Sequence, residues 1–137
     1  MTDAVEKTSI AIACGGTGGH LFPGLAVAEQ LRERACDVTL LVSPKDVDQQ
    51  AVKAAHGMRV VTLPAAAFQT GSRLAFFRGF AQSYRAARKL FHERRPHAAL
   101  GTGGFTSAPP LLAARRCGAA TFLHESNAIP GRANRCL

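Results

Sequence analysis

The chain has 137 residues, enough for one domain with a sizeable hydrophobic core. Apolar residues make up 47% of it, which is ordinary for a globular protein, but a net charge of +8 favours a polyanionic partner such as nucleic acid, an anionic membrane or a phosphorylated substrate. Four scattered cysteines exclude a zinc-finger or disulfide framework and indicate reduced thiols in a cytosolic protein. Apolar runs are too short to span a bilayer, so any membrane contact is expected to be peripheral.

Hydrophobic patterning predicts strands that alternate with helices after a disordered lead at residues 1–8, which is too acidic for a signal peptide. In chain order we expect a strand at Ser9–Ala13, a helix at 23–35, a strand at Asp37–Val42, a helix from 43 to about 56, a strand at 59–63, a helix at 72–94, a strand at 98–100, a helix from 107 to about 117 and a strand at Ala120–Leu123. This order favours an α/β fold, with a Rossmann-like parallel sheet and helices on both faces.

Three polar or glycine-rich clusters follow predicted strands, at residues 15–20, 101–104 and 124–127. Ligands of such sheets bind outside the carboxyl ends of the strands. The sequence therefore predicts that the three clusters share one edge of the sheet.

The first cluster holds four glycines and Thr17 in residues 15–19, followed directly by His20. Glycines at this density let a ligand approach the main chain, and a helix N-terminus behind them offers free N–H groups. Pro23 suits the first turn of that helix. Phosphate is the expected ligand.

This cluster matches neither the P-loop, since no lysine follows it, nor the dinucleotide fingerprint, which lacks its third glycine here. His20 is the residue that could move a proton at neutral pH. The alternative is that His20 only caps the turn.

The predicted helix at 72–94 is rich in arginine and aromatic residues. We expect one stripe of it to face the core, which leaves Phe76 and Phe80 beside the stripe as partly exposed aromatic surface. The stripe consists of Leu74, Phe77, Ala81, Tyr84 and Ala87. An apolar patch among arginines is typical of an interfacial membrane-binding element, although an ordinary amphipathic helix with a solvated basic face is the alternative. No motif supports nucleic-acid binding.

Three motifs occur together, in a fixed order, over the chain after about Ser9: GGTGGHLFPGLAVA from residue 15, GTGGFTSAP from residue 101, and HESN with GRAN from residue 124. Together they resemble the MurG-type N-acetylglucosaminyltransferases of glycosyltransferase family 28. The resemblance implies a glycosyltransferase B architecture of two Rossmann-like domains facing a cleft. Residues 9–137 would be the N-terminal, acceptor-side domain, cut short at its C-terminal end, with the C-terminal donor domain absent.

The activity implied by the resemblance is transfer of GlcNAc from UDP-GlcNAc to lipid I (undecaprenyl-diphospho-MurNAc-pentapeptide), with inversion, in peptidoglycan synthesis. It would take place peripherally on the cytoplasmic face of the bacterial membrane, without a cofactor or a metal and without nucleic acid. We expect residues 1–137 alone to be inactive.

The resemblance also implies roles for single residues. His20 would be the general base, and Glu125 a second catalytic residue. The implied substrate-binding residues are Thr17, Gly18, Gly19, Gly103, Gly104, His124, Asn127 and Asn134. The implied membrane contacts are Leu74, Phe76, Phe77, Arg78, Phe80 and Arg85. Phe105 and Ser126 depart from the usual tyrosine and glutamine of the family.

Three other functions remain open. One is a related transferase with a diacylglycerol or sterol acceptor, and another is a non-catalytic module that binds membrane and polyprenyl diphosphate. A dehydrogenase is the weakest, although Asp37 is roughly placed for a ribose contact.

Overall fold

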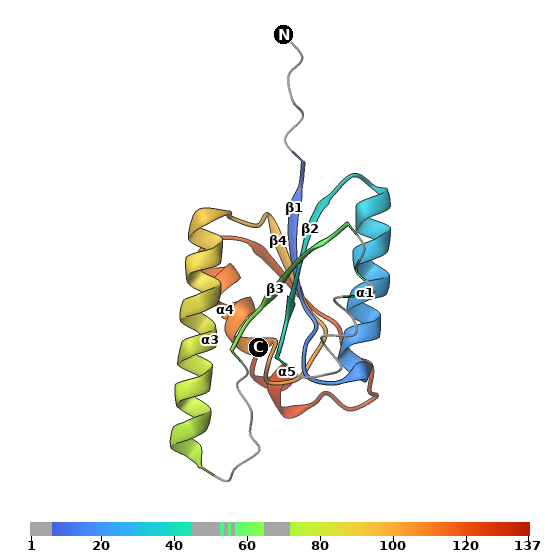
Figure 1. Cartoon of the computed structure of the whole chain (residues 1–137). Helices are drawn as coiled ribbons and strands as arrows, with labels where there is room; N and C mark the ends of the chain where they lie inside the picture. The colour runs from blue at the N-terminus through green and yellow to red at the C-terminus, as the bar shows by residue number, and fades with distance from the viewer. Residues whose placement is uncertain (1–6, 45–52, 54, 56, 65–71) are drawn as a thin grey trace.

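The computed structural model describes residues 7–44, 53, 55, 57–64 and 72–137 (Figure 1). Strands and helices alternate along these residues, as the sequence predicts. In chain order the elements are β1 (Ser9–Ala13), α1 (Gly18–Glu33), β2 (Asp37–Val42), β3 (Arg59–Thr62), α3 (Arg73–Glu93), β4 (Ala98–Gly101), α4 (Ala108–Arg116), β5 (Ala120–Leu123) and α5 (Arg132–Cys136). None of the described helices combines the length and the apolar character that crossing a bilayer needs.

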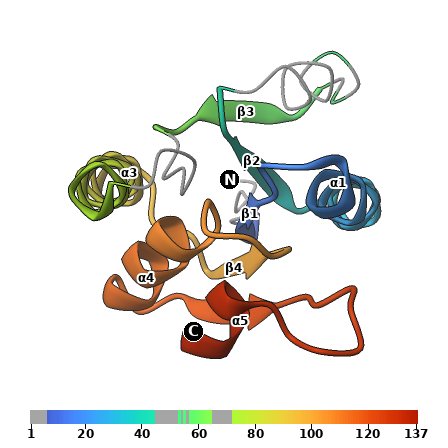
Figure 2. The ribbon, with the colours of Figure 1, turned by 90° about the horizontal axis from the view of Figure 1, so that it is seen from below.

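The five strands form one parallel sheet in the order β3-β2-β1-β4-β5. Viewed along the strands, α1 covers one face, while α3 and α4 cover the other (Figure 2). This is the predicted Rossmann-like arrangement. It places β1 in the centre, where Ile12 pairs with Leu40 of β2 on one side and with Leu100 of β4 on the other.

The core has two layers because the central strands are buried on both faces. Ile12 and Leu40 point towards α1, where Leu21 and Ala28 complete a cluster of buried side chains. Neighbouring side chains of β1 point the opposite way and pack with α3 and α4, where Phe91 is 3% exposed. Successive side chains of one strand therefore hold helices on opposite faces of the sheet.

Helix α1 begins at Gly18, five residues before the predicted start, so the expectation that Pro23 occupies the first turn is wrong. The chain enters the helix through Thr17, whose extended backbone has a φ of −151°. Pro23 lies inside the helix, where its missing N–H costs the intrahelical bond to the Gly19 carbonyl. His20 is consequently part of the first helical turn and not of a preceding loop.

The predicted core stripe of α3 is confirmed at Ala87, which is buried, and at Tyr84, which packs against the core, but it is wrong for its first two members. Leu74 and Phe77 are 80% and 64% exposed, whereas the fully buried residues are Ser83, Ala87 and Phe91. Ala87 shares a buried cluster with Ala113 and Ala114 of α4, and the two helices pack against each other. The aromatic residues expected outside the stripe, Phe76 and Phe80, are half-buried.

Other elements agree with the sequence or lie outside the described residues. β1, β2 and β5 have their predicted bounds, and β4 extends one residue further, to Gly101. β3 ends at Thr62, one residue early, and α5 is an element that the sequence analysis missed. The helix predicted at 43–56, the lead at 1–8 and the loop at 65–71 fall largely outside the described part of the chain.

Candidate active site

The candidate site lies where β1 and β4, neighbours in the sheet, end side by side. From β1 the chain continues towards β2 and β3, whereas from β4 it continues towards β5 on the other side. The connections after β1 and β4 therefore diverge, and such a switch point is where open α/β sheets bind ligands. Both glycine clusters follow these two strands, and residues 124–127 follow β5, so the structure brings all three clusters to one edge of the sheet.

Hydroxyl side chains tie the two glycine loops together. Thr106 Oγ1 donates to the Gly15 carbonyl at 2.6 Å, and Ser107 Oγ lies 3.2 Å from the Ala13 carbonyl oxygen at the end of β1. The Thr102 amide donates to the Ala13 carbonyl at 3.0 Å. The sequence analysis did not single out these three residues; its available signal was their place beside the glycines of the second cluster.

The N-terminus of α1 is the part of this edge suited to an anion. The amides of Gly18 and Gly19 stand in the first turn, where no intrahelical acceptor exists, and that turn holds no acidic side chain. Thr17 and Gly19 are exposed. α4 also begins at this edge, but Pro109 and Pro110 in its first turn remove two N–H groups, so α1 offers the better anion site.

His20 lies between the two glycine loops. Its Nδ1 is 3.0 Å from the Thr102 carbonyl oxygen, and its ring is half-buried. A Cβ atom at Gly103 would come within 2.8 Å of Nδ1, and one at Gly104 within 3.3 Å of the ring Cδ2. The structure thus places the predicted base directly against two predicted substrate-binding glycines.

Glu125 organises the loop after β5. Its carboxylate accepts hydrogen bonds from the amides of Asn127 and Gly131, both at 3.0 Å, and from the side chains of Asn127 and Asn134, also both at 3.0 Å. The backbone hydrogen bonds from Gly131 and Asn127 lower the pKa of Glu125 to about 2. A carboxylate so weakly basic and so fully hydrogen-bonded is poorly suited to proton transfer, and its geometry is that of a structural anchor.

The same loop brings Asn134 of α5 towards the second glycine cluster, with Nδ2 3.8 Å from the Cβ position of Gly103. Its Oδ1 and the Nδ1 atom of His124 are buried without a hydrogen-bond partner among the described residues. Buried polar atoms in native proteins are almost always paired. These two atoms are therefore candidates for contacts to a bound substrate.

Asp37 stands at the opposite end of the sheet from this site. It begins β2 and forms an ion pair with Arg94, which follows α3. An acid at the amino end of β2 cannot reach a ribose at the carboxyl edge, which removes the residue on which the dehydrogenase alternative depended.

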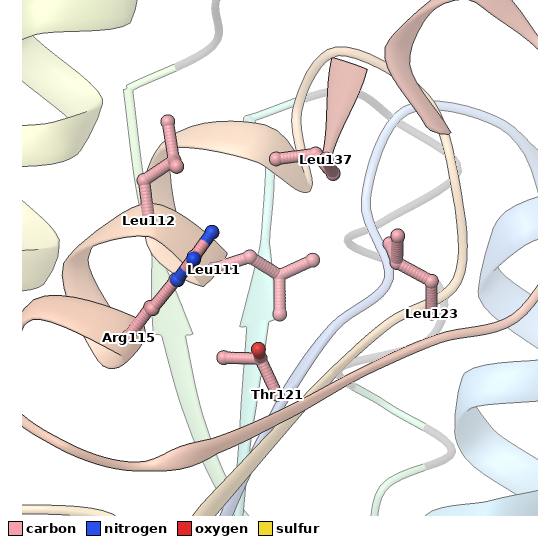
Figure 3. A pocket seen from close by; sticks show the side chains of 6 residues that line it. All are labelled: Leu111, Leu112, Arg115, Thr121, Leu123 and Leu137. Carbon is pink, nitrogen blue, oxygen red and sulfur yellow. The ribbon is translucent and has the colours of Figure 1, made fainter. Parts of the chain in front are cut away.

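A pocket of about 120 Å³ opens between α4, β5 and the last residue of the chain (Figure 3). Leucine side chains line it together with the polar Arg115 and Thr121. None of the predicted site residues lines it. The lining residues are Leu111, Leu112, Arg115, Thr121, Leu123 and Leu137.

The fold and the site together define a class of protein: α/β proteins with a Rossmann-like sheet, in which a glycine-rich helix N-terminus lies beside a histidine. The chain belongs to glycosyltransferase family 28, because the sequence profile of that family's N-terminal domain matches residues 10–137. This confirms the family resemblance carried by the three motifs.

Curated relatives agree with this assignment. The UDP-N-acetylglucosamine–N-acetylmuramyl-(pentapeptide) pyrophosphoryl-undecaprenol N-acetylglucosamine transferase of Pelobacter propionicus is 44% identical over 131 residues, which cover 92% of this chain and 34% of the relative. The transferase of the same name from Allorhizobium ampelinum is 41% identical over 136 residues, covering 97% and 36%. The chain thus spans about a third of the length of these relatives.

Solved structures show the same fold. The crystal structure of Acinetobacter baumannii MurG superposes with a TM-score of 0.82 at 28% identity, over 94% of this chain and 38% of the other. The calicheamicin glycosyltransferase CalG4 superposes with a TM-score of 0.63 at 22% identity, over 95% and 34%, which supports the fold alone.

Proposed function

We propose that this chain is the acceptor-side part of an enzyme that transfers GlcNAc from UDP-GlcNAc to lipid I. The observation that carries the proposal is the juxtaposition of two groups at one edge of the sheet. These are the amides of Gly18 and Gly19, which have no intrahelical acceptor, and the imidazole of His20 in the same turn. The names of the curated relatives supply the donor and the acceptor.

The chemistry follows from these two groups. The 4-hydroxyl oxygen of the acceptor sugar attacks C1 of GlcNAc, the bond from C1 to the diphosphate oxygen breaks, and UDP leaves with the bonding electrons. His20 takes the hydroxyl proton as general base, and the configuration at C1 inverts. Thr17, Gly18 and Gly19 contact the donor. The glycine loop around them receives the acceptor's diphosphate, whose charge the helix N-terminus stabilises.

The loop after β5 completes the binding surface. His124 and Asn134 contact substrate through their unpartnered buried atoms, and exposed Asn127 contacts the donor. Glu125 holds this loop in place by its four hydrogen bonds and does not exchange a proton during the reaction.

A chimera tests this proposal, because the chain spans only about a third of its relatives. The chain is fused to the remaining part of the Pelobacter propionicus transferase, and UDP release is measured from UDP-GlcNAc with a soluble lipid I analogue. We expect turnover by the chimera and none by residues 1–137 alone. His20→Ala should lower kcat by about 10²- to 10⁴-fold, the usual contribution of a general base.

His97→Ala is the matched control, since His97 is an exposed histidine just before β4, at the end of the sheet opposite the glycine loops. A chimera that turns over equally well with either substitution would contradict the role of His20. A folded chimera that releases no UDP with lipid I but does so with diacylglycerol or a sterol would move the assignment to a different acceptor.

We further propose that α3 holds the protein on the anionic cytoplasmic face of the membrane. Leu74 and Phe77 project from its first turns into solvent, and Arg78 and Arg85 are exposed further along. Exposed apolar side chains beside cations suit the interface of an anionic bilayer. Phe76 and Phe80, half-buried beneath them, support this surface from below and are not its outermost contacts.

The basic character continues from α3 onto α4. A groove of about 230 Å³ between the two helices is lined by Arg88, His92, Arg95 and Arg116, together with Phe91, Ala113 and Cys117. No carboxylate lines this groove. Such a groove is suited to the phosphate of a lipid headgroup, and it extends the surface that faces the membrane.

A further inference from the structure

His20 is held by the peptide that follows β4. Its Nδ1 lies 3.0 Å from the Thr102 carbonyl oxygen, and the Thr102 hydroxyl donates back to the His20 carbonyl at 2.5 Å. Thr102 is 1% exposed, so water has little access to its side of either bond. Two reciprocal hydrogen bonds thus join residues that are 82 positions apart in the chain.

The acceptor in the first bond determines where the imidazole proton lies. A carbonyl oxygen has no proton to donate, so a hydrogen bond between it and Nδ1 requires that Nδ1 carries the hydrogen. In the neutral ring, Nε2 then holds the lone pair. Within the described part of the chain Nε2 has no hydrogen-bond partner, which leaves it available to a substrate hydroxyl.

The glycines after Thr102 form the seat of the ring. Gly103 and Gly104 have φ values of +115° and +77°, a conformation that side chains rarely adopt. A Cβ atom at Gly103 would also lie 2.8 Å from His20 Nδ1, closer than van der Waals contact allows. A glycine is required here both by the backbone conformation and by the ring lying on it.

We propose that Thr102 and Gly103 are positioning residues that hold His20 in its Nδ1–H tautomer, so that Nε2 is the atom that accepts the proton of the attacking hydroxyl. The part about proton acceptance rests on the function proposed above. The Nδ1–H tautomer and the packing of the ring on Gly103 do not depend on that function, since they follow from contacts within the chain.

Nuclear magnetic resonance tests the tautomer on the 137-residue chain, without any activity. A long-range ¹H–¹⁵N correlation spectrum, recorded where the ring is neutral, shows which nitrogen carries hydrogen, and His20→Gln identifies the His20 signals among the five histidines. We expect Nδ1 to have the chemical shift of a protonated nitrogen and Nε2 that of an unprotonated one. A ring protonated at Nε2, or averaging between the two forms, would overturn the proposal.

Gly103→Ala should abolish the single tautomer, because the new methyl group displaces the ring from the Thr102 carbonyl. Gly118→Ala is the matched control: its φ is also positive, at +81°, but its Cβ would meet only the flexible tip of Arg95. Loss of the Nδ1–H signature in Gly103→Ala and its retention in Gly118→Ala support the seat. Retention in both variants argues against it.

Kinetics of the chimera then test the consequence for proton transfer. Thr102→Val should lower kcat about tenfold with little change in KM, since the short hydrogen bond from the Thr102 hydroxyl to the His20 carbonyl, which fixes the backbone of the base, is lost. Thr102→Ser, which keeps the hydroxyl, should restore most of the rate. An unchanged kcat in the valine variant would overturn the positioning role of the Thr102 hydroxyl. A chimera that is inactive throughout contradicts the proposed function instead, while the spectrum still decides the tautomer.

Discussion

Phe105 and Phe76 meet edge to face, with ring centroids 5.5 Å apart and planes inclined by 86°. One residue belongs to the second glycine loop, beside the seat of His20, and the other to the first turn of α3. Because Phe77, which is exposed on the proposed membrane surface, contacts the same Phe76 ring at 5.7 Å, the aromatic residues connect that surface with the candidate active site.

Removing the Phe105 ring should loosen the second glycine loop. An edge-to-face pair contributes about 0.5–1.5 kcal/mol beyond burial, so Phe105→Ala is expected to speed hydrogen exchange of amides in residues 102–107 by roughly 2- to 10-fold. Phe77→Ala truncates an exposed ring and serves as the control, while Phe105→Tyr keeps the contact. Exchange rates in Phe105→Ala equal to those of the wild type would show that the pair does not restrain the loop.

Binding to anionic vesicles should depend on the outer face of α3. Replacing Leu74 and Phe77 together by serine removes two apolar contacts of about 1.5 kcal/mol or more each at full burial, so sedimentation with phosphatidylglycerol vesicles should weaken at least tenfold. Binding of the wild type should also fall as salt is raised, because the arginines contribute electrostatically.

The matched control for this experiment substitutes two exposed apolar residues elsewhere, Phe22 and Ile129, by serine. If these substitutions weaken vesicle binding as much as the pair in α3, the membrane surface lies elsewhere on the molecule. Neutral phosphatidylcholine vesicles, which should bind weakly, separate the apolar contribution from the electrostatic one.

Glu125 should make stability depend on pH at the acidic end. Its pKa is lowered from 4.5 to about 2 in the folded chain, so its stabilising contribution is fully present above about pH 4.5 and is lost as the pH falls towards 2. Glu125→Gln removes the charge, and the difference in melting temperature between wild type and variant should shrink across this interval. A difference that stays constant from pH 6 to pH 2.5 would mean that the charge does not anchor the loop.

Gly24 should be intolerant of a methyl group although it lies inside a helix. A Cβ atom at Gly24 would stand 2.4 Å from the Cys14 Cβ, where α1 packs on the end of β1. Overpacking costs about 1–3 kcal/mol, which exceeds the roughly 0.5–1 kcal/mol that alanine gains over glycine in a helix. Denaturant unfolding should therefore show net destabilisation by Gly24→Ala.

Gly19→Ala provides the comparison for this substitution. The Cβ of that variant would have Thr17 Oγ1 as its nearest neighbour, at 3.8 Å, so no overpacking is expected. Equal stability of the two variants would show that the contact between α1 and Cys14 can relax.

Much of the architecture could be predicted from the sequence because it rests on local patterns. Buried apolar runs such as Asp37–Val42 specify strands by composition, and the alternation of strands with helices leads to a parallel sheet. The same alternation predicted that the clusters after β1, β4 and β5 meet at one edge, because parallel strands end on the same side.

Local patterns could not decide which way an element faces. The period of α3 was visible in the sequence, but Leu74 and Phe77 are exposed, and the buried residues are Ser83, Ala87 and Phe91 in a helix that packs against α4. For a similar reason the start of α1 was predicted too late. Pro23 is typical of a first turn, yet the extended Thr17 starts the helix at Gly18.

The sequence by itself determined the family, the sheet and the presence of a glycine-rich turn that ends in His20. Only the tertiary structure decided what surrounds that histidine, because the Thr102 carbonyl and Gly103 reach it from a strand 82 residues away. It also brought four donors onto the Glu125 carboxylate, which is why we propose an anchoring role for this residue. Hydrogen-bond geometry between distant segments is absent from any local pattern, and it is what assigns chemistry to these residues.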